Sequence, residues 1–354
     1  MRKKGGHFPK GRGTAANPPN RFEKIETVPD SEWLDHAEAV RPETSYLSDA
    51  SRTILARNDS PDIAFDFSIN PYRGCEHGCV YCYARPTHEY FGFSSGLDFE
   101  TKIIVKKNAP ALLDAEFSRA GWQPQVVALS GNTDCYQPVE RTLGLTRKCL
   151  RVFLAHRNPV AMITKNALVL RDLDILKELA ALGLVSVAIS ITTMDNELTR
   201  VMEPRTSAPH KRFAALAALI ESGIPACVMI APVIPGINDH EIPAILAHAA
   251  SLGVQRASYI LLRLPYQVKE LFSGWLQQHF PDKKNKVLNT VMETRAGKLN
   301  DPNFGKRMSG TGVRAETIRR IFEVNCRKYH MNEAEFILRT DLFVRAPSNQ
   351  MILF

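Results

Sequence analysis

The sequence has no run of about 18 apolar residues, the length a helix needs to cross a membrane. No apolar run near its start resembles a secretion signal, so we expect a cytoplasmic protein with no membrane partner. A disulfide framework is not expected either, because the cysteine count is odd, at seven, and thiols stay reduced in the cytoplasm.

A second group of closely spaced cysteines is also missing. Cys75, Cys79 and Cys82 stand in one C-x3-C-x2-C run, and the other cysteines are isolated. A structural zinc site takes four ligands, often from two such pairs, and neither His77 nor His88 has the spacing to supply one. The run instead favours an iron–sulfur cubane, in which three thiolates bind three irons and the fourth iron stays open.

Basic residues outnumber acidic ones. The formal net charge is +8, a balance that suits a polyanionic partner such as nucleic acid, although charge alone does not decide this. The first residues are rich in Arg, Lys and Gly without any hydrophobic period. We therefore expect residues 1–59 to form a basic, largely disordered arm and lead-in, followed by a core at 60–280 and a helical extension at 281–354.

Within the core, apolar strand-like runs alternate with amphipathic helix-like runs. The strand-like runs carry little polar alternation, which is typical of parallel strands buried on both faces. They lie at 64–69, 102–105, 125–129, 160–164, 185–191, 226–231 and 257–262. Helices are predicted at 110–119, 142–156, 170–182, 210–222, 240–252, 270–279, 287–294 and 316–329. This repetition predicts an α/β fold of right-handed βαβ units, and six such units suggest a partial (β/α)6 barrel.

The cysteine run, with Tyr81 just before its third cysteine, resembles the signature of the radical S-adenosylmethionine (SAM) superfamily. The segments 133–138, 171–174 and 235–239 resemble the branch described as similar to spore photoproduct lyase, or DNA repair photolyase. The resemblance covers roughly residues 60–265 and implies a TIM-type partial barrel that binds a 4Fe–4S cluster and SAM. In this chemistry the amino and carboxylate groups of SAM chelate the open iron, and an electron from the cluster cleaves SAM to a 5′-deoxyadenosyl radical.

The resemblance also implies which residues contact SAM. Tyr81 is expected near the adenine, and Ile234 and Gly236 match part of the family's adenine motif. The family's Gly-Gly-Glu-like motif, which holds the SAM amino group, is replaced here by a segment of acceptors, so the residue that takes this role stays open. The candidates are Ser130, Asn132 and Asp134.

Further residues are candidates for SAM or substrate contacts. Lys165 is a candidate partner for the SAM carboxylate, Ser190 for the ribose hydroxyls, and Arg205 for the carboxylate or a substrate phosphate. Cys135 is predicted at the mouth of the barrel, where, together with Tyr136, it could return a hydrogen atom to a product radical. The alternative for Cys135 is a buried thiol without chemistry.

The sequence thus predicts a radical SAM enzyme, lyase-like in its resemblance, that acts on damaged or modified nucleic acid. Modification of RNA or protein is an alternative, and a non-catalytic zinc-binding nucleic-acid module is another. SAM is an expected partner, as is an electron donor of the flavodoxin or ferredoxin type, and nucleic acid is a candidate partner.

Overall fold

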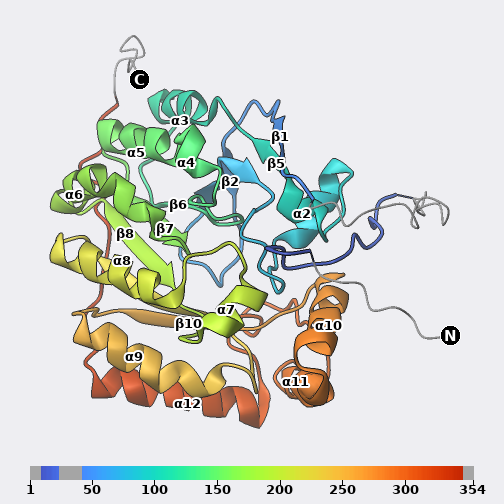
Figure 1. The fold of residues 1–354 in the computed structure, drawn as a ribbon. Helices are drawn as coiled ribbons and strands as arrows, with labels where there is room; N and C mark the ends of the chain where they lie inside the picture. The colour runs from blue at the N-terminus through green and yellow to red at the C-terminus, as the bar shows by residue number, and fades with distance from the viewer. Residues whose placement is uncertain (1–8, 24–41, 346–354) are drawn as a thin grey trace.

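A seven-stranded sheet forms the centre of the protein in a computed structural model, which describes residues 9–23 and 42–345. Its strand order is β10-β9-β8-β7-β6-β3-β2, and neighbouring strands are parallel except for the antiparallel β2. The strands are β2 (Leu55–Arg57), β3 (Phe67–Ile69), β6 (Val127–Leu129), β7 (Val160–Thr164), β8 (Val185–Ser190), β9 (Ala226–Val233) and β10 (Ala257–Leu261). Six parallel strands, connected by helices, confirm the predicted α/β fold (Figure 1).

Helices cover the sheet and extend beyond it. They are α2 (Asp98–Thr101), α3 (Ala109–Ser118), α4 (Glu140–Leu143), α5 (Leu145–His156), α6 (Leu173–Ala181), α7 (Asn196–Met202), α8 (Pro209–Glu221), α9 (Ile242–Ser251), α10 (Val268–His279), α11 (Lys284–Glu293) and α12 (Gly312–Lys328). Short 3-10 helices are η1 (Arg85–Phe91), η2 (Ala167–Asp172), η3 (Asp239–Glu241) and η4 (Pro281–Lys283). No helix in the described ranges is long and apolar enough to cross a membrane.

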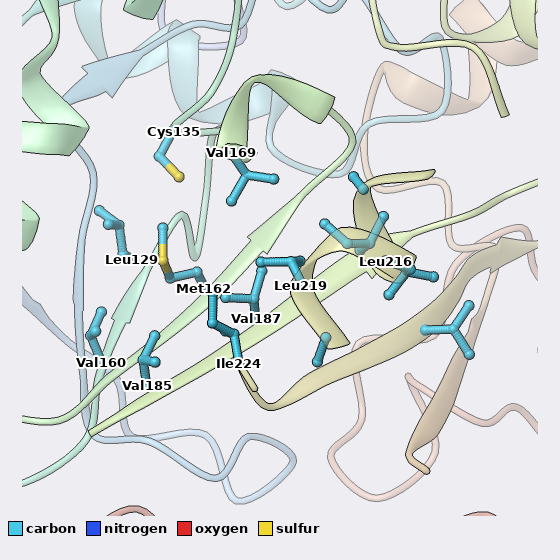
Figure 2. Packing of buried hydrophobic residues seen from close by; sticks show 14 of the residues in the cluster. Leu129, Cys135, Val160, Met162, Val169, Val185, Val187, Leu216, Leu219 and Ile224 are labelled. Atoms are coloured by element: carbon cyan, nitrogen blue, oxygen red, sulfur yellow. The ribbon is translucent and has the colours of Figure 1, made fainter. Parts of the chain in front are cut away.

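The main core lies between the sheet and the helices that flank it. Figure 2 shows Val187 of β8 beside Leu219 of α8, and both side chains are fully buried. Burial of each such side chain stabilises the fold by roughly 1.5–3 kcal/mol. In β7 and β9 buried positions alternate with partly buried ones, and no position is exposed, so the strands read as nearly continuous apolar runs.

Predicted and observed elements agree closely in the core, and the differences have local causes. The predicted helix at 142–156 is divided into α4 and α5 at Gly144, whose φ of 62° is a left-handed conformation that ends α4. A small sheet of β1 (Ser45–Ser48), β5 (Lys102–Val105) and β4 (Tyr72–Arg73) stands beside the main one, in the order β1-β5-β4. Of these three strands, the sequence pattern predicts β5 alone.

Residues 9–23, here called the N-terminal strap, correct the expectation of disorder. The strap packs against the segment 78–100, and its Thr14 and Asn20 are buried. A Cβ atom on Gly13 would lie 1.7 Å from the Gly78 carbonyl oxygen, so only glycine fits this approach. Asn20 donates hydrogen bonds to the carbonyls of Glu89 and Phe93. The amino-acid composition did not predict that the strap is ordered, because its hydrogen-bond partners lie far away in the sequence. The rest of the predicted arm, at 1–8 and 24–41, lies outside the described residues.

The C-terminal region covers the seam between β10 and the opposite edge of the sheet. The main chain of Leu261 donates to the Met308 carbonyl, 2.9 Å away. Arg295 is fully buried and donates to the carbonyls of Leu261 and Leu262. Arg307 reaches across to form an ion pair with Asp62, at 2.5 Å. Side chains and loops thus bridge the seam, where no strand pairing within 9–23 and 42–345 joins β10 to β2 or β3.

Candidate functional site

The cysteine loop, residues 74–82, follows β4 and contacts the segments that follow β6, β7 and β8. Cys75 and Cys79 are buried, Cys82 is partly buried, and all three thiols are free. Gly74 and Gly78 have φ of 77° and 66°, a conformation that favours glycine and lets the loop turn tightly. The loop therefore presents three thiols at the carboxyl ends of the parallel strands, where sites of this fold class lie.

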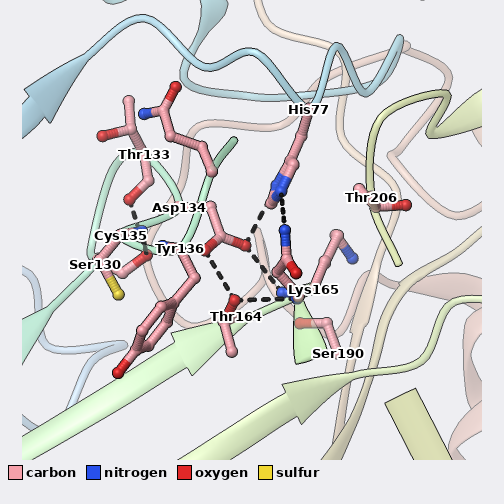
Figure 3. A network of polar contacts seen from close by, with 12 residues as sticks. His77, Ser130, Thr133, Asp134, Cys135, Tyr136, Thr164, Lys165, Ser190 and Thr206 are labelled. Atoms are coloured by element: carbon pink, nitrogen blue, oxygen red, sulfur yellow. Dashed lines mark hydrogen bonds and ion pairs between the residues drawn. The ribbon is translucent and has the colours of Figure 1, made fainter. Parts of the chain in front are cut away.

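A buried carboxylate, Asp134, ties the loop to the main sheet (Figure 3). Its oxygens lie 3.3 Å from His77 Nδ1 in the loop, 2.7 Å from Thr164 Oγ1 and 2.8 Å from the main-chain nitrogen of Lys165. Asn166 contacts the other ring nitrogen of His77 at 3.2 Å. Burial by itself raises the pKa of Asp134, but the nearby His77 and these donors lower it below its usual value.

A second buried carboxylate, Glu203, holds the loop through Tyr81. Glu203 accepts hydrogen bonds from the hydroxyls of Tyr81 and Thr192, pairs with Arg212, and lies 3.3 Å from Lys165 Nζ. Burial alone would raise the pKa of Glu203, but Arg212 and Lys165 hold it well below the usual value. This network keeps the aromatic ring before Cys82 in one position.

Glu100 is the third such carboxylate and joins the loop to the N-terminal strap. It pairs with Arg85 at 2.6 Å and accepts from the Gly13 main chain and the Thr14 hydroxyl, both at 2.9 Å. Arg85 also donates to the Cys79 carbonyl, at 3.0 Å. Glu100 and Arg85 are both fully buried. Together with the contacts of Asp134 and Glu203, this pair fixes the position of the cysteine loop.

The three thiols fit an iron–sulfur cubane. Burial raises the pKa of Cys75, Cys79 and Cys82, and a bound metal reverses this preference because a coordinated thiol is deprotonated. Within residues 9–23 and 42–345, no group of three or more His, Cys, Asp or Glu side chains is arranged around a single ion. A cubane makes no such demand, because each thiolate binds a different iron.

Of the three candidates after β6, two are engaged within the protein. Ser130 has a φ of 84° and uses its hydroxyl to close the turn in which it lies. Asp134 holds His77, as described above. Asn132 donates its main-chain N–H to Asn70 and its side-chain NH2 to Thr87, the latter at 3.3 Å. The side-chain carbonyl oxygen of Asn132 is thus the acceptor that stays available among the three.

The two cationic candidates have different partners. Lys165 points inward and donates to the Thr192 hydroxyl at 3.0 Å and the Ala231 carbonyl at 2.8 Å. Arg205 instead pairs with Glu76 in the loop, at 3.2 Å. The structure therefore does not bring Lys165 and Arg205 together on one carboxylate, because each already has partners in a separate network.

The apolar candidates do meet beside the cysteine loop. Ile234 is fully buried in one cluster with Cys79 and Tyr81. Gly236 follows with a φ of 81°, and Ser190 is buried at the end of β8. The ends of β8 and β9 thus lie at the same edge of the sheet as the thiols.

Cys135 and Tyr136 belong to the segment beyond the end of β6 that packs on the cysteine loop, where Gln137 bonds to Gly74 and Glu76, and their role as hydrogen-atom donors stays a prediction. Both are fully buried in the main core, where Figure 2 shows Cys135 near Leu129 and Val169. The Tyr136 hydroxyl donates to Asp172, at 3.0 Å. The burial of the Cys135 side chain favours the alternative of a buried thiol without chemistry.

Two residues that the sequence analysis missed lie beside the turn that follows β6. Tyr83 follows the last loop cysteine, is 45% exposed and donates to the Gly131 carbonyl at 2.6 Å. The Arg263 guanidinium lies 4.5 Å from the centre of the Tyr83 ring, and no described residue accepts a hydrogen bond from it. Both positions were open to prediction, since Tyr83 extends the cysteine run and Arg263 follows the last core strand.

His88 adds a pH dependence to the segment that packs on the loop. Its ring lies 5.2 Å from the Phe93 ring and 5.6 Å from the Phe99 ring, and neither ring nitrogen has a partner among the described residues. Burial lowers its pKa to about 4, below the 6.5 of an exposed histidine. Between pH 4 and pH 6.5, His88 is therefore protonated in the unfolded chain but stays neutral in the folded chain.

Because of this proton, stability is expected to be full above pH 6.5 and to fall as the pH drops toward 4. Between pH 7 and pH 4.5 the wild type should lose about 2 to 3 kcal/mol more unfolding free energy than His88→Phe. Urea unfolding across this range, followed by circular dichroism, measures the difference. Parallel pH profiles for the two proteins would contradict it.

Comparisons with known proteins agree with this geometry. The family model described as Radical SAM superfamily matches residues 69–249, more than half of the 354 residues. An uncharacterized protein of Mycobacterium tuberculosis is 37% identical over 232 residues, which cover 64% of this chain and 68% of the relative. An uncharacterized protein of Methanocaldococcus jannaschii is 31% identical over 175 residues, covering 49% of this chain and 63% of the relative.

Solved structures with a similar fold include spore photoproduct lyase complexed with dinucleoside spore photoproduct. That structure has a TM-score of 0.58 and 18% identity, and the match covers 86% of this chain and 84% of that one. A mutant form of the lyase with bound AdoMet and dinucleoside spore photoproduct has a TM-score of 0.55 and 18% identity, with coverage of 80% and 77%. At these identities the likeness concerns the fold.

Proposed function

Because this chain belongs to the radical SAM superfamily, we propose that Cys75, Cys79 and Cys82 hold its 4Fe–4S cluster. The chain is a radical SAM enzyme whose cofactors are this cluster and SAM, so the alternative of a non-catalytic zinc module is set aside. When bound, the cluster supplies the electron that cleaves SAM reductively to a 5′-deoxyadenosyl radical. The observation that carries the assignment is one loop with three free thiols, held by three buried carboxylates.

The chain's own residues position the cofactors and exclude water. The side-chain carbonyl oxygen of Asn132 is our candidate acceptor for the SAM amino group, since an ammonium needs such acceptors. Tyr81, Ile234 and Gly236 are the candidates for the adenine, and Ser190 for the ribose. Lys165 holds the Glu203 network and places a positive charge near the thiols. These assignments are supported by the position of the ends of β8 and β9, which lie beside the cysteine loop.

For the substrate, we propose a damaged or modified nucleic acid. The formal charge of +8 and the branch resemblance support this class. A lyase of similar fold binds a dinucleoside photoproduct, which is likewise a nucleic-acid fragment. Modification of RNA or protein stays the alternative. We expect an electron donor of the flavodoxin or ferredoxin type to reduce the cluster, and the core at 60–280 to carry this chemistry.

The test is anaerobic reconstitution with iron and sulfide, then dithionite reduction with SAM and quantification of 5′-deoxyadenosine. The wild type should bind about four irons and form the product. Cys79→Ala is expected to lose cluster and product together, because one iron loses its thiolate. Cys149→Ala is the matched control, since it removes a buried thiol of α5 outside the loop and should keep both cluster and product.

Two outcomes would contradict the assignment. One is a single tightly bound zinc with no cluster in the wild type. The other is equal iron content and equal product in Cys79→Ala and in the wild type, because a cluster that survives this change is held elsewhere.

A further inference from the structure

A hollow of about 720 Å³ opens beside the cysteine loop, on the side toward α4 and α8. Its walls come from the start of α4, the start of η2 and the segment 205–211 that enters α8. The main-chain N–H of Arg205 donates to the His77 carbonyl, and Asn166 contacts the His77 ring. Since Arg205 and Asn166 both line the hollow, it shares a wall with the loop.

The charge of this hollow has one sign. Arg141, Arg205 and Lys211 line it, and no acidic residue is among the described residues that do. Arg141 and Lys211 are exposed, and no described carboxylate lies within ion-pair distance of either. Arg205 is anchored by Glu76. Arg141 and Lys211 therefore remain available to a ligand, and Arg205 adds a positive charge that its contact with Glu76 holds in place.

The start of α8 adds to this charge. Ala208, its N-cap residue, lines the hollow, and no side chain caps this 13-residue helix. Pro209 has no N–H, and the amides of Lys211 and Arg212 donate to the Ala208 carbonyl, so the helix contributes its dipole and not a set of free amides. The N-terminal end of a helix carries a partial positive charge that favours oxyanions. Helix, cations and concave shape all point to an anionic ligand.

We propose that this hollow binds phosphodiester groups of the nucleic-acid substrate. The inference rests on the proposed function, which names that substrate class. Phosphate oxygens match the fork of an arginine and the point charge of a lysine. The wall shared with the cysteine loop places such a backbone contact next to the site, where it positions the strand without reading its sequence.

Binding of a fluorescein-labelled single-stranded DNA of about 12 nucleotides to the full chain tests this by anisotropy, over a range of salt concentrations. The variant Arg141→Gln/Lys211→Gln should bind roughly tenfold more weakly, because it loses charged hydrogen bonds. Its plot of log affinity against log salt should be shallower by about 1.4, which is about 0.7 for each phosphate that is no longer neutralised. Arg327→Gln/Lys328→Gln, which removes two exposed cations of α12, is the matched control and should bind as the wild type does.

The outcomes separate this inference from the proposed function. Equal binding by wild type and Arg141→Gln/Lys211→Gln would overturn the inference alone and leave nucleic acid as the substrate class. Absence of DNA binding by the wild type would overturn both, whereas the 5′-deoxyadenosine assay would still report on the cofactor chemistry. If the variant binds DNA normally but loses binding to reduced flavodoxin, the hollow serves the electron donor, and the inference fails.

Discussion

Replacing Glu100 with alanine is expected to lower the free energy of unfolding by about 3–5 kcal/mol and to reduce the iron that the reconstituted protein retains. The change leaves the Arg85 guanidinium buried without its partner carboxylate. It also removes the carboxylate that accepts hydrogen bonds from Gly13 and Thr14, so the N-terminal strap loses two of its hydrogen bonds to the segment 78–100. Urea unfolding and iron analysis measure the two effects.

A matched control for this change is Glu116→Ala in α3. Glu116 pairs with Arg119 at 2.8 Å, but the Arg119 side chain is 65% exposed, so the loss should stay within about 1 kcal/mol. Trypsin offers a third measurement, because the strap contains Arg12 and Arg21 and its release should speed cleavage there. A Glu100→Ala protein that unfolds like the control and keeps its iron would contradict the role of Glu100.

The second large effect is expected for Glu203→Ala, again a loss of about 3–5 kcal/mol. This variant leaves Arg212 buried without its carboxylate and removes an acceptor from Tyr81 and Thr192. Because Tyr81 precedes Cys82 in the loop, 5′-deoxyadenosine formation should fall with stability. Glu197→Ala, which breaks an exposed pair with Arg200, should change either quantity little.

The pH dependence of this second effect follows from the lowered pKa of Glu203. A carboxyl whose pKa is lower in the folded chain stabilises it above the unfolded value of about 4.3, and this stabilisation disappears as the pH falls further. The difference between the wild type and Glu203→Ala should therefore be full at pH 7 and shrink below about pH 4. A difference that stays constant down to acid pH would show that folding does not lower the pKa of Glu203.

The strands and helices of the core were predictable because buried parallel strands leave continuous apolar runs. β7 and β5 coincide with their predicted ranges, and the core helices agree to within a few residues. The cysteine loop was predictable from spacing alone. The direction of each polar side chain was not, since it depends on partners far along the chain. Asp134 turns toward His77, and Arg205 toward Glu76, because those contacts form only in the folded protein.

The N-terminal strap is a second case in which contacts between residues far apart in the sequence could not be predicted. Nothing in the composition of residues 9–23 distinguishes it from a disordered segment, because its glycines and polar residues bury no apolar stripe. Its order comes from acceptors that the core provides, such as the Glu100 carboxylate and the Glu89 carbonyl. A sequence pattern cannot reveal partners that lie some 70 to 90 positions away.

Arg295 has a consequence for how copies of this protein behave in solution. The outer edge of a sheet is a template for pairing with another chain, which leads to aggregation. Here the guanidinium of Arg295 takes the two carbonyls at the end of β10, and the Met308 carbonyl takes the Leu261 amide. A side chain and a loop thus occupy the place of a further strand, and the Leu261 amide and the Leu261 and Leu262 carbonyls are already bonded within the described residues instead of being offered to a second molecule.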